Sequence, residues 1–267
     1  MGDCSFRAIQ VLKSVACIAA EDTRHSQLLL DHYGIKTPMV SYHQYNESRR
    51  AEDLLGQLNQ GHDIALISDA GTPLISDPGY TLVALVKTQG ITVVPIPGPC
   101  ALITALCASG LPSTSFQFIG FLPAKAQQRE KMLLSLAESQ ETLIFYEAPH
   151  RILSTLKACE AILGERECAI AKELTKHFEA IQKGTPATLI AWLEEDVRRQ
   201  QGEFVVIIAP ASVRQGLSLA AKQLLEKLLP HLPLKLAAQI VSDTYTEKKA
   251  GLYDYGLSLR TEGNSHG

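Results

Sequence analysis

The sequence lacks any apolar run close to the roughly 20 residues that a membrane-spanning helix needs, and it does not open on an apolar stretch of the signal-peptide type. It also lacks an excess of either charge, because 25 Lys and Arg oppose 28 Asp and Glu for a net charge of -3. The first absence predicts a cytoplasmic protein. The second argues against a general attraction to nucleic acid, although a local basic patch remains compatible with it.

Several common site motifs are missing as well. The six cysteines form no C-x-x-C pair and have no histidine at zinc-finger spacing, so no metal site is predicted and the thiols are expected to be reduced. No G-x-G-x-x-G, G-x-x-x-x-G-K-[ST] or G-x-S-x-G is present. The dinucleotide-binding fold, the phosphate-binding loop of ATPases and the nucleophile elbow of hydrolases are therefore not indicated.

The composition is that of a soluble globular protein, with 46% hydrophobic and 20% charged residues over 267 positions. In the first part, apolar strands at 63–69 and 91–96 are each followed by a Gly/Pro turn and a helix, at 80–88 and 100–108. This alternation predicts an α/β domain with parallel strands over residues 1–113.

A second α/β domain is predicted over residues 114–211. Its expected strands are 116–120, 141–146, 168–172, 178–183 and 204–209, and its helices are 127–139, 151–163 and one that starts at Thr185-Pro186. Residues 211–216 are expected to be a linker. Helices at 217–229, from 234 to 240 and at 247–257, with a break at 242–244, then predict a small helical module over 217–261. A helix-turn-helix-like module and an ordinary helical tail fit this pattern about equally well.

The most informative segment is SDAGTPLISDPG at 68–79, which directly follows a predicted buried strand. Ligands of α/β sheets bind at this end of the strands, small residues let a ligand approach the backbone, and a carboxylate accepts hydrogen bonds there. A tight turn that needs Gly and Pro only for its geometry is about equally compatible. The same alternatives apply to PGPCA at 97–101.

Charged and aromatic residues gather at two further strand ends, in FYEAPHR at 145–151 and AKELTK at 171–176. Solvated charges at helix entrances would give the same pattern. Two clusters at equivalent ends of neighbouring strands nevertheless favour a functional site.

These segments, together with AAEDTR at 19–24, HQYNE at 43–47 and AKELTKHFE at 171–179, resemble the tetrapyrrole (corrin/porphyrin) methylase family, and within it a branch that methylates ribosomal RNA. The resemblance covers about residues 12–210, and the tail is similar to the small C-terminal helical module of that branch. It implies two α/β domains with S-adenosylmethionine in the cleft between them, usually in a homodimer. The implied reaction is 2′-O-methylation of a cytidine ribose in the decoding region of 16S rRNA, within the small ribosomal subunit.

The resemblance also implies a set of site residues. Those expected to bind the cofactor are Asp69, Ala70, Gly71, Thr72, Gly98, Pro99, Cys100, Ala101 and Tyr146. Cys100 departs from the serine expected there, and a thiol is a weaker hydrogen-bond partner.

A ribose hydroxyl is a poor nucleophile, so its methylation calls for a base or a cation beside the oxygen. Lys172 is the predicted cation, and Glu147 or Glu173 the predicted proton acceptor. The side chains predicted to contact RNA are Arg24, His43, Tyr45, Arg49, Arg50, Arg129 and Arg151. Two other functions fit this sequence: methylation of a small tetrapyrrole, and RNA or ribosome binding without catalysis.

The family opens with a further strand and a Gly/Pro turn, whereas this sequence begins MGDCSFR, just beyond that turn. The resemblance therefore implies an N-terminally shortened form. Loss of a buried strand leaves unpaired backbone groups and an open apolar edge. On this basis the shortened form is expected to be less stable, and its activity is left open.

Overall fold

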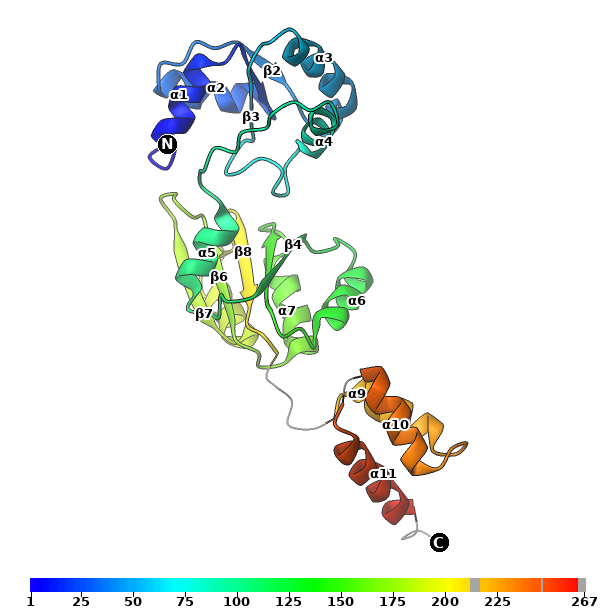
Figure 1. Cartoon of the computed structure of the whole chain (residues 1–267). Helices are drawn as coiled ribbons and strands as arrows, with labels where there is room; N and C mark the ends of the chain where they lie inside the picture. Colours follow the sequence, from blue (N-terminus) through cyan, green and yellow to red (C-terminus); the bar gives the residue numbers. More distant parts are fainter. Residues whose placement is uncertain (212–216, 246, 264–267) are drawn as a thin grey trace. The chain divides into compact units, whose positions relative to one another are not determined.

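The computed structural model describes residues 1–211, 217–245 and 247–263. The chain divides into two compact units, Met1–Pro210 and Ala211–Gly267. The first unit contains two β-sheets with their helices, and the second contains three helices (Figure 1). The predicted linker at 211–216 falls almost wholly on residues 212–216, which lie outside the described residues.

The first sheet is parallel, as predicted, with strand order β2-β1-β3. β1 (Cys17–Ala20) is the central strand and is buried throughout. β2 (Met39–Ser41) and β3 (Ile64–Ile67) flank it. One face packs against α3 (Glu47–Asn59) and α4 (Tyr80–Thr88), and the other packs against α1 (Phe6–Ser14) and α2 (Thr23–His32). Each strand is followed by a helix, so the segments after β1, β2 and β3 all start at the carboxyl edge of this sheet.

The predicted strand at 91–96 is not formed. Residues 91–100 have no regular secondary structure, and the side chain of Val94 is 67% exposed. Pro95 and Pro97 have no backbone N–H to donate to a neighbouring strand. β3 correspondingly pairs only with β1 among the described strands, and its residues are half-buried rather than fully buried as the apolar pattern predicts.

The second sheet has five strands in the order β4-β5-β8-β6-β7. Its strands are β4 (Phe116–Phe121), β5 (Thr142–Glu147), β6 (Cys168–Lys172), β7 (Ala180–Gly184) and β8 (Phe204–Ile208), each within two residues of its predicted range. β4 and β5 are parallel, whereas β8 runs antiparallel to β5 and β6, so the sheet is mixed. β8 lies at the centre of the sheet and is completely buried.

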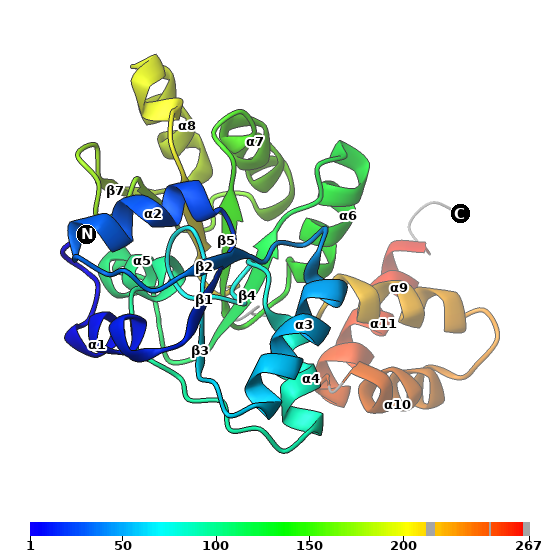
Figure 2. The ribbon, with the colours of Figure 1, turned by 90° about the horizontal axis from the view of Figure 1, so that it is seen from above.

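Helices cover both faces of the second sheet. α5 (Ala101–Ser109) packs over β8 and β6 (Figure 1), where Leu102 and Leu106 contact Ile144 and Val205. α6 (Ala126–Leu136), α7 (Ile152–Leu163) and α8 (Pro186–Glu194) lie on the other side; Figure 2 shows them as a separate group. α5 precedes residue 113 in the chain, yet it packs on the second sheet. The predicted N-cap Thr185 accepts a hydrogen bond from the Thr188 N–H at the start of α8.

The second unit consists of α9 (Leu219–Leu228), α10 (Leu234–Tyr245) and α11 (Lys249–Gly263) around a small core that includes Leu225, Val241 and Leu252. The three-helix expectation is confirmed, but the break predicted at 242–244 is wrong, because α10 continues to Tyr245. Thr244 is accommodated within the helix because its hydroxyl donates a hydrogen bond to the Ile240 carbonyl, one turn earlier, at 2.7 Å.

Candidate functional site

The loop that follows β3, residues 68–79, has a strained backbone. Gly71 has a φ of 84° and Gly79 a φ of 140°, and the non-glycine residues Leu74 and Ser76 adopt φ values of 72° and 66°. Left-handed backbone at a non-glycine residue is uncommon and clusters at ligand-binding loops. At Gly79 a Cβ atom would lie 2.6 Å from Leu74 Cδ1, so the fold admits only glycine there without rearrangement.

This loop is held against the segment 97–100. The Thr72 hydroxyl donates a hydrogen bond to the Pro99 carbonyl at 2.8 Å. A Cβ on Gly71 would lie 3.7 Å from the same carbonyl oxygen, so the two backbones approach each other closely. Two segments separated by about one helix in the sequence therefore form facing walls.

A cavity of about 420 Å³ lies at these walls, within the size range of small-molecule sites. The predicted cofactor residues that line it are Asp69, Ala70, Gly71, Thr72, Gly98 and Pro99. Side chains from α1, α2 and β3, such as Leu12, Leu29 and Ile67, supply an apolar wall. The structure thus brings six of the nine predicted cofactor residues together around one cavity.

The other three, Cys100, Ala101 and Tyr146, do not line this cavity. Cys100 is the N-cap of α5 and Ala101 is its first residue. The Tyr146 hydroxyl faces the Leu102 N–H in the first turn of that helix, and burial with the neighbouring Cys100 thiol raises the pKa of Tyr146 to about 12. The Tyr146 ring also packs edge-on against Phe118 at 5.0 Å. Tyr146 therefore contacts the start of α5, next to the segment that lines the cavity, and not the cavity itself.

Three carboxylates gather at the carboxyl edge of the first sheet: Glu21 after β1, and Asp69 and Asp77 after β3. Burial, followed by the charges of Asp77 and Asp69, raises the pKa of Glu21. Burial also raises the pKa of Asp77, as does the charge of Asp69. The nearby Arg24 is bound to Asp22 at 3.1 Å, so its charge is already paired. This edge therefore carries a negative potential that suits a cationic ligand.

Glu147, a predicted proton acceptor, lies in a closed network on the second sheet. Its side chain is fully buried. Its carboxylate accepts hydrogen bonds from the Ala148 N–H at 2.8 Å and the Thr155 hydroxyl at 2.6 Å, and forms an ion pair with Arg151 Nε at 3.1 Å. All of its partners are internal, so the arrangement favours a structural role over proton acceptance.

The same network engages Arg151, one of the predicted RNA contacts, because its guanidinium also donates to the Leu122 carbonyl at 2.5 Å. Arg129, another such contact, is only 7% exposed and donates to the Ala124 carbonyl at 3.4 Å. Neither guanidinium faces solvent as a phosphate contact requires. This burial disfavours Arg129 and Arg151 as RNA contacts, which stay predictions; both were identified by residue type, and burial of a charge is not visible in the sequence.

The remaining predicted RNA contacts lie at the carboxyl edge of the first sheet. Arg24 is in the first turn of α2, and Arg49 and Arg50 are in the first turn of α3. His43 and Tyr45 lie in the loop between β2 and α3, with ring centroids 5.9 Å apart, and Tyr45 is 88% exposed. These five side chains thus follow β1, which pairs with the cavity-lining β3, and β2, on the far side of β1.

β6 ends at Lys172, and Glu173 is the first residue after it. Lys172 is 5% exposed and makes no hydrogen bond or ion pair with any described residue. Because side chains alternate along a strand, it points to the face covered by α7 and α8, opposite to Ala171. Burial alone would raise the pKa of Glu173, but the Glu203 N–H and the Lys176 ammonium, 2.9 Å from the carboxylate, hold it below its usual range. Glu173 is a poor proton acceptor for this reason.

Thr175 and Glu21 are among the site residues that were not predicted. Thr175 lines the cavity from the segment after β6 and has a φ of 63°. It lies in the AKELTK segment, so its neighbourhood was visible in the sequence but its backbone strain was not. Glu21 immediately precedes Asp22 in the AAEDTR segment, and only the folded register places its carboxylate beside Asp69.

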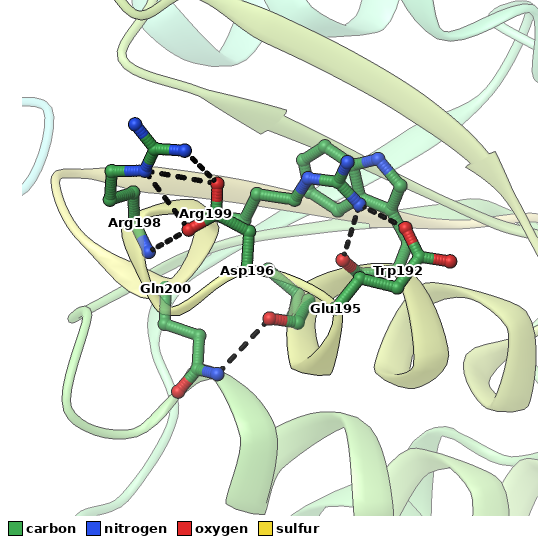
Figure 3. A network of polar contacts seen from close by, with 7 residues as sticks. Trp192, Glu195, Asp196, Arg198, Arg199 and Gln200 are labelled. Atoms are coloured by element: carbon green, nitrogen blue, oxygen red, sulfur yellow. Dashed lines mark hydrogen bonds and ion pairs between the residues drawn. The ribbon is translucent and has the colours of Figure 1, made fainter.

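A further group of basic residues, in η1 (Val197–Gln200), is neutralised internally (Figure 3). Arg198 pairs with Asp196 at 2.8 Å, while Arg199 pairs with Glu195 and stacks over the Trp192 ring at 4.8 Å. Across the described residues there is also no group of three potential metal ligands, and no helix there is long and apolar enough to cross a membrane.

Comparison with known proteins agrees with this architecture. The chain is 51% identical over 260 residues to the ribosomal RNA small subunit methyltransferase I of Haemophilus influenzae, covering 96% of this chain and 92% of the relative. It is 47% identical to the protein of the same name from Pseudomonas aeruginosa, covering 96% and 93%. The methyltransferase CobJ has a similar fold at 17% identity, with a TM-score of 0.56 over 80% of this chain and 91% of CobJ. Uroporphyrin-III-C-methyltransferase from Thermus thermophilus is similar at a TM-score of 0.54 and 18% identity, over 78% and 88%.

Two family matches together span most of the chain. Residues 215–260 match the RsmI C-terminal HTH domain, which agrees with the three helices of the second unit. Residues 1–190 match the Tetrapyrrole (Corrin/Porphyrin) Methylases, over the first sheet, the cavity and the second sheet up to β7. The chain therefore belongs to the tetrapyrrole (corrin/porphyrin) methylase family, in the branch of the ribosomal RNA small subunit methyltransferases I.

Proposed function

We propose that this chain is an S-adenosylmethionine-dependent methyltransferase of small-subunit ribosomal RNA, and that it methylates the 2′-hydroxyl of a cytidine ribose in the decoding region of 16S rRNA. The observation that carries this proposal is the cavity between the strained loop 68–79 and the segment 97–99. It lies at the carboxyl end of β3 in a chain about half identical to methyltransferases named for this RNA.

The residues of the cavity fit S-adenosylmethionine. The cofactor carries positive charge on its sulfonium and amino groups, and the carboxylates of Asp69, Glu21 and Asp77 give this edge a negative potential. The cavity of about 420 Å³, with Leu12, Leu29 and Ile67 in its lining, offers apolar surface to the uncharged parts of the cofactor. When bound, the cofactor supplies an electrophilic methyl group.

The proposed roles of the residues follow from the two segments that line the cavity. Asp69, Ala70, Gly71 and Thr72 are proposed to form one wall of the cofactor site, and Gly98 and Pro99 the other. Cys100 and Ala101 follow that second wall at the start of α5, and Tyr146 contacts the first turn of this helix. Lys172 remains the proposed cation beside the reacting oxygen, because it ends β6 three residues before Thr175, which lines the cavity.

We place the RNA on the carboxyl edge of the first sheet. Arg49 stands in the first turn of α3 there, where it can contact a phosphate, and the exposed Tyr45 ring can stack on a base. Arg24 and Arg50 can do the same by exchanging their surface ion pairs with Asp22 and Asp53 for a phosphate. Because the overall charge is -3, the electrostatic attraction to RNA has to come from a local group of basic residues and not from the net charge.

The protein is proposed to act in the cytoplasm as a homodimer. The outward face of α5 supports self-association, because its exposed residues are uncharged: Ala101, Ile103, Thr104, Cys107 and Ala108. A helix face without charges is unusual on the surface of a monomer. Light scattering of the purified chain measures the oligomeric state directly.

Methyl transfer to purified small ribosomal subunits tests the proposal. Subunits are prepared from cells that lack the homologous enzyme and incubated with the chain and methyl-labelled S-adenosylmethionine. The label is expected in 16S rRNA, at one cytidine whose 3′-phosphodiester resists alkaline hydrolysis because its 2′-oxygen is blocked. Labelling of a tetrapyrrole instead of RNA would contradict the proposal. So would RNA binding without transfer, the behaviour of an inactive ribosome-binding relative.

A further inference from the structure

Phe121, the last residue of β4, is an aromatic side chain that the proposed function does not use. It is 53% exposed, whereas the next residue, Leu122, is buried in the core that α6, α7 and α8 form with the second sheet. β4 is an edge strand, and it ends at the same edge of the sheet as its parallel neighbour β5. Single exposed apolar residues are common on protein surfaces, so the reason for this one has to be sought in how the backbone places it.

A β-bulge determines which face of the sheet carries Phe121. The pairing of β4 with β5 shifts between Phe118 and Gly120, so β4 has one extra residue at this point. Side chains alternate along a regular strand, and without the bulge Phe121 would share the face of Ile119, which packs into the core beneath α6, α7 and α8. The bulge instead pairs Phe121 with Tyr146 on the opposite face, the one that α5 covers. It therefore turns an aromatic side chain out of the core, as bulges beside active sites often do.

The bulge lies directly beside the loop 68–79. Gly120 has a φ of 76°, in the left-handed region that favours glycine, and a Cβ there would lie 3.6 Å from Ser76 Oγ. Ile75 of the same loop packs on the α5 face of the second sheet. Residues 68–73 of this loop line the cavity. One loop thus contributes to the cavity at one end and contacts the bulge that carries Phe121 at the other.

Phe121 is the exposed end of a row of three aromatic rings. Its ring centroid lies 5.8 Å from that of Tyr146, which in turn lies 5.0 Å from that of Phe118, and both contacts are edge-to-face. These contacts hold the Phe121 ring in place, while about half of its surface stays open to solvent. A ring that is already held loses little conformational entropy when a flat ligand stacks on it. These are the properties of a stacking platform.

A basic side chain follows closely in the sequence. Lys125, four residues after Phe121, is exposed at the N-cap of α6 and takes part in none of the ion pairs among the described residues. An open aromatic ring together with an unpaired cation is the combination that binds unstacked nucleotides, since the ring takes a base and the cation a phosphate.

We propose that Phe121 is the platform on which the base of the target nucleotide stacks, and that Lys125 contacts a phosphate of the same strand. This inference rests on the proposed rRNA methylation and names a residue that positions its substrate. An enzyme that modifies one nucleotide has to take it out of the base stack, and the free base is then commonly held on an aromatic ring. A second copy of this chain could also cover an exposed ring, but the position of the bulge beside the cofactor loop favours a ligand of the reaction.

Methyl transfer to small ribosomal subunits tests this role, with the affinity for S-adenosylmethionine, the melting temperature and the oligomeric state measured in parallel. Phe121→Ala is expected to lower kcat/KM for the subunits about 5- to 100-fold, because the base loses its stacking partner. The other three quantities should stay unchanged, since the ring is half-exposed and does not line the cavity.

Two further substitutions separate stacking from apolar packing. Phe121→Tyr keeps an aromatic face and should stay within about threefold of the parent, whereas Phe121→Leu keeps the apolar character without a ring and should lose about fivefold or more. The matched control is Phe116→Ala, because Phe116 is also a partly exposed phenylalanine of β4 but lies at the opposite end of the strand. It should leave kcat/KM within about twofold of the parent value.

Three results overturn the inference. The first is a Phe121→Ala value within about twofold of the parent, and the second is a Phe121→Leu value equal to that of the parent. The third is a Phe121→Ala variant that changes its oligomeric state or loses affinity for S-adenosylmethionine, which would assign the ring to a subunit interface or to the cofactor.

A fluorescence measurement keeps this inference separate from the proposed function. The chain has one tryptophan, so Phe121→Trp combined with Trp192→Phe leaves a single indole, at the proposed platform. Small ribosomal subunits are expected to quench its fluorescence, because a base stacks on it. If the parent chain transfers no methyl group, the proposed function fails, and this quenching still decides the role of Phe121. Unchanged fluorescence at subunit concentrations that saturate binding would overturn it.

Discussion

The carboxylates at the strand ends of the two sheets have opposite environments. At the first sheet, Glu21 and Asp77 are partly buried next to other acids, and their pKa values are raised. At the second sheet, Glu147 is saturated by Arg151, Thr155 and a backbone N–H, and Glu173 has a lowered pKa beside Lys176. Acids that have no ion pair mark a place where a cationic ligand is expected to balance their charge, whereas acids paired with Arg or Lys stabilise the fold. This contrast fits the proposed function, in which most of the cofactor site lies at the first sheet, while the Glu147 network stabilises the second.

The largest expected effect comes from breaking the scaffold network. Glu147→Ala leaves the buried Arg151 guanidinium and the Thr155 hydroxyl without their partner, and it should lower the free energy of unfolding by about 3–5 kcal/mol. Urea denaturation measures this. Glu160→Ala on α7 is the matched control, since Glu160 is exposed and has no side-chain partner, and it should change stability by less than about 0.5 kcal/mol. Equal stability of the two variants would contradict the structural role of Glu147.

The second effect probes the strained loop of the first sheet. Gly79→Ala places a Cβ at a φ of 140° and 2.6 Å from Leu74 Cδ1, so it should destabilise the protein by about 1–3 kcal/mol. Gly56→Ala offers the opposite case, because Gly56 is inside α3 with open space around it. That change should stabilise the protein by about 0.5–1 kcal/mol. Thermal melts of the two variants should therefore shift in opposite directions.

The smallest expected effect is on stability: replacing Asp77 and replacing Glu173 by their amides should change the free energy of unfolding in opposite directions. A raised carboxyl pKa means that the charged form of Asp77 is disfavoured in the folded state. Asp77→Asn should therefore increase the free energy of unfolding at pH 7, by less than about 1 kcal/mol. This gain should vanish as the pH falls below the unfolded-state pKa of Asp, which is about 4. Glu173 has a lowered pKa and stabilises the fold above about pH 4.5. Glu173→Gln should therefore decrease stability at pH 7, and the loss should disappear as the pH falls through the folded-state pKa of Glu173. If both variants changed the stability at pH 7 in the same direction, the contrast between the two sheets would be contradicted.

Much of the architecture could be predicted from local patterns, and the exceptions have physical reasons. Strands β4 to β8 were found because apolar runs flanked by turn residues are typical of buried strands. The segment 91–96 has the same pattern, but a strand exists only where a neighbour shares its hydrogen bonds, and none of the described strands lies beside it. Pairing partners are long-range information that apolar periodicity does not contain.

The candidate site was predictable in part for a similar reason. The motif at 68–72 and the segment 98–99 were identified from sequence, and they line one cavity. Residue type alone did not separate the buried Arg129 and Arg151 from the exposed Arg24 and Arg49, since burial depends on tertiary packing. Thr175 and Glu21 belong to the site because the folded backbone brings their segments to it, which their residue types do not predict.

The central claim is that the cavity between the loop 68–79 and the segment 97–99 holds S-adenosylmethionine. Calorimetric titration of the purified chain tests it most directly, with Thr72→Val as a variant that removes only the hydroxyl bonded to the Pro99 carbonyl. We predict one-to-one binding with a dissociation constant on the order of micromolar, and binding about three- to tenfold weaker for Thr72→Val because the two walls lose their hydrogen bond. No binding by the folded chain would contradict the claim, and so would equal affinities of the parent and the variant.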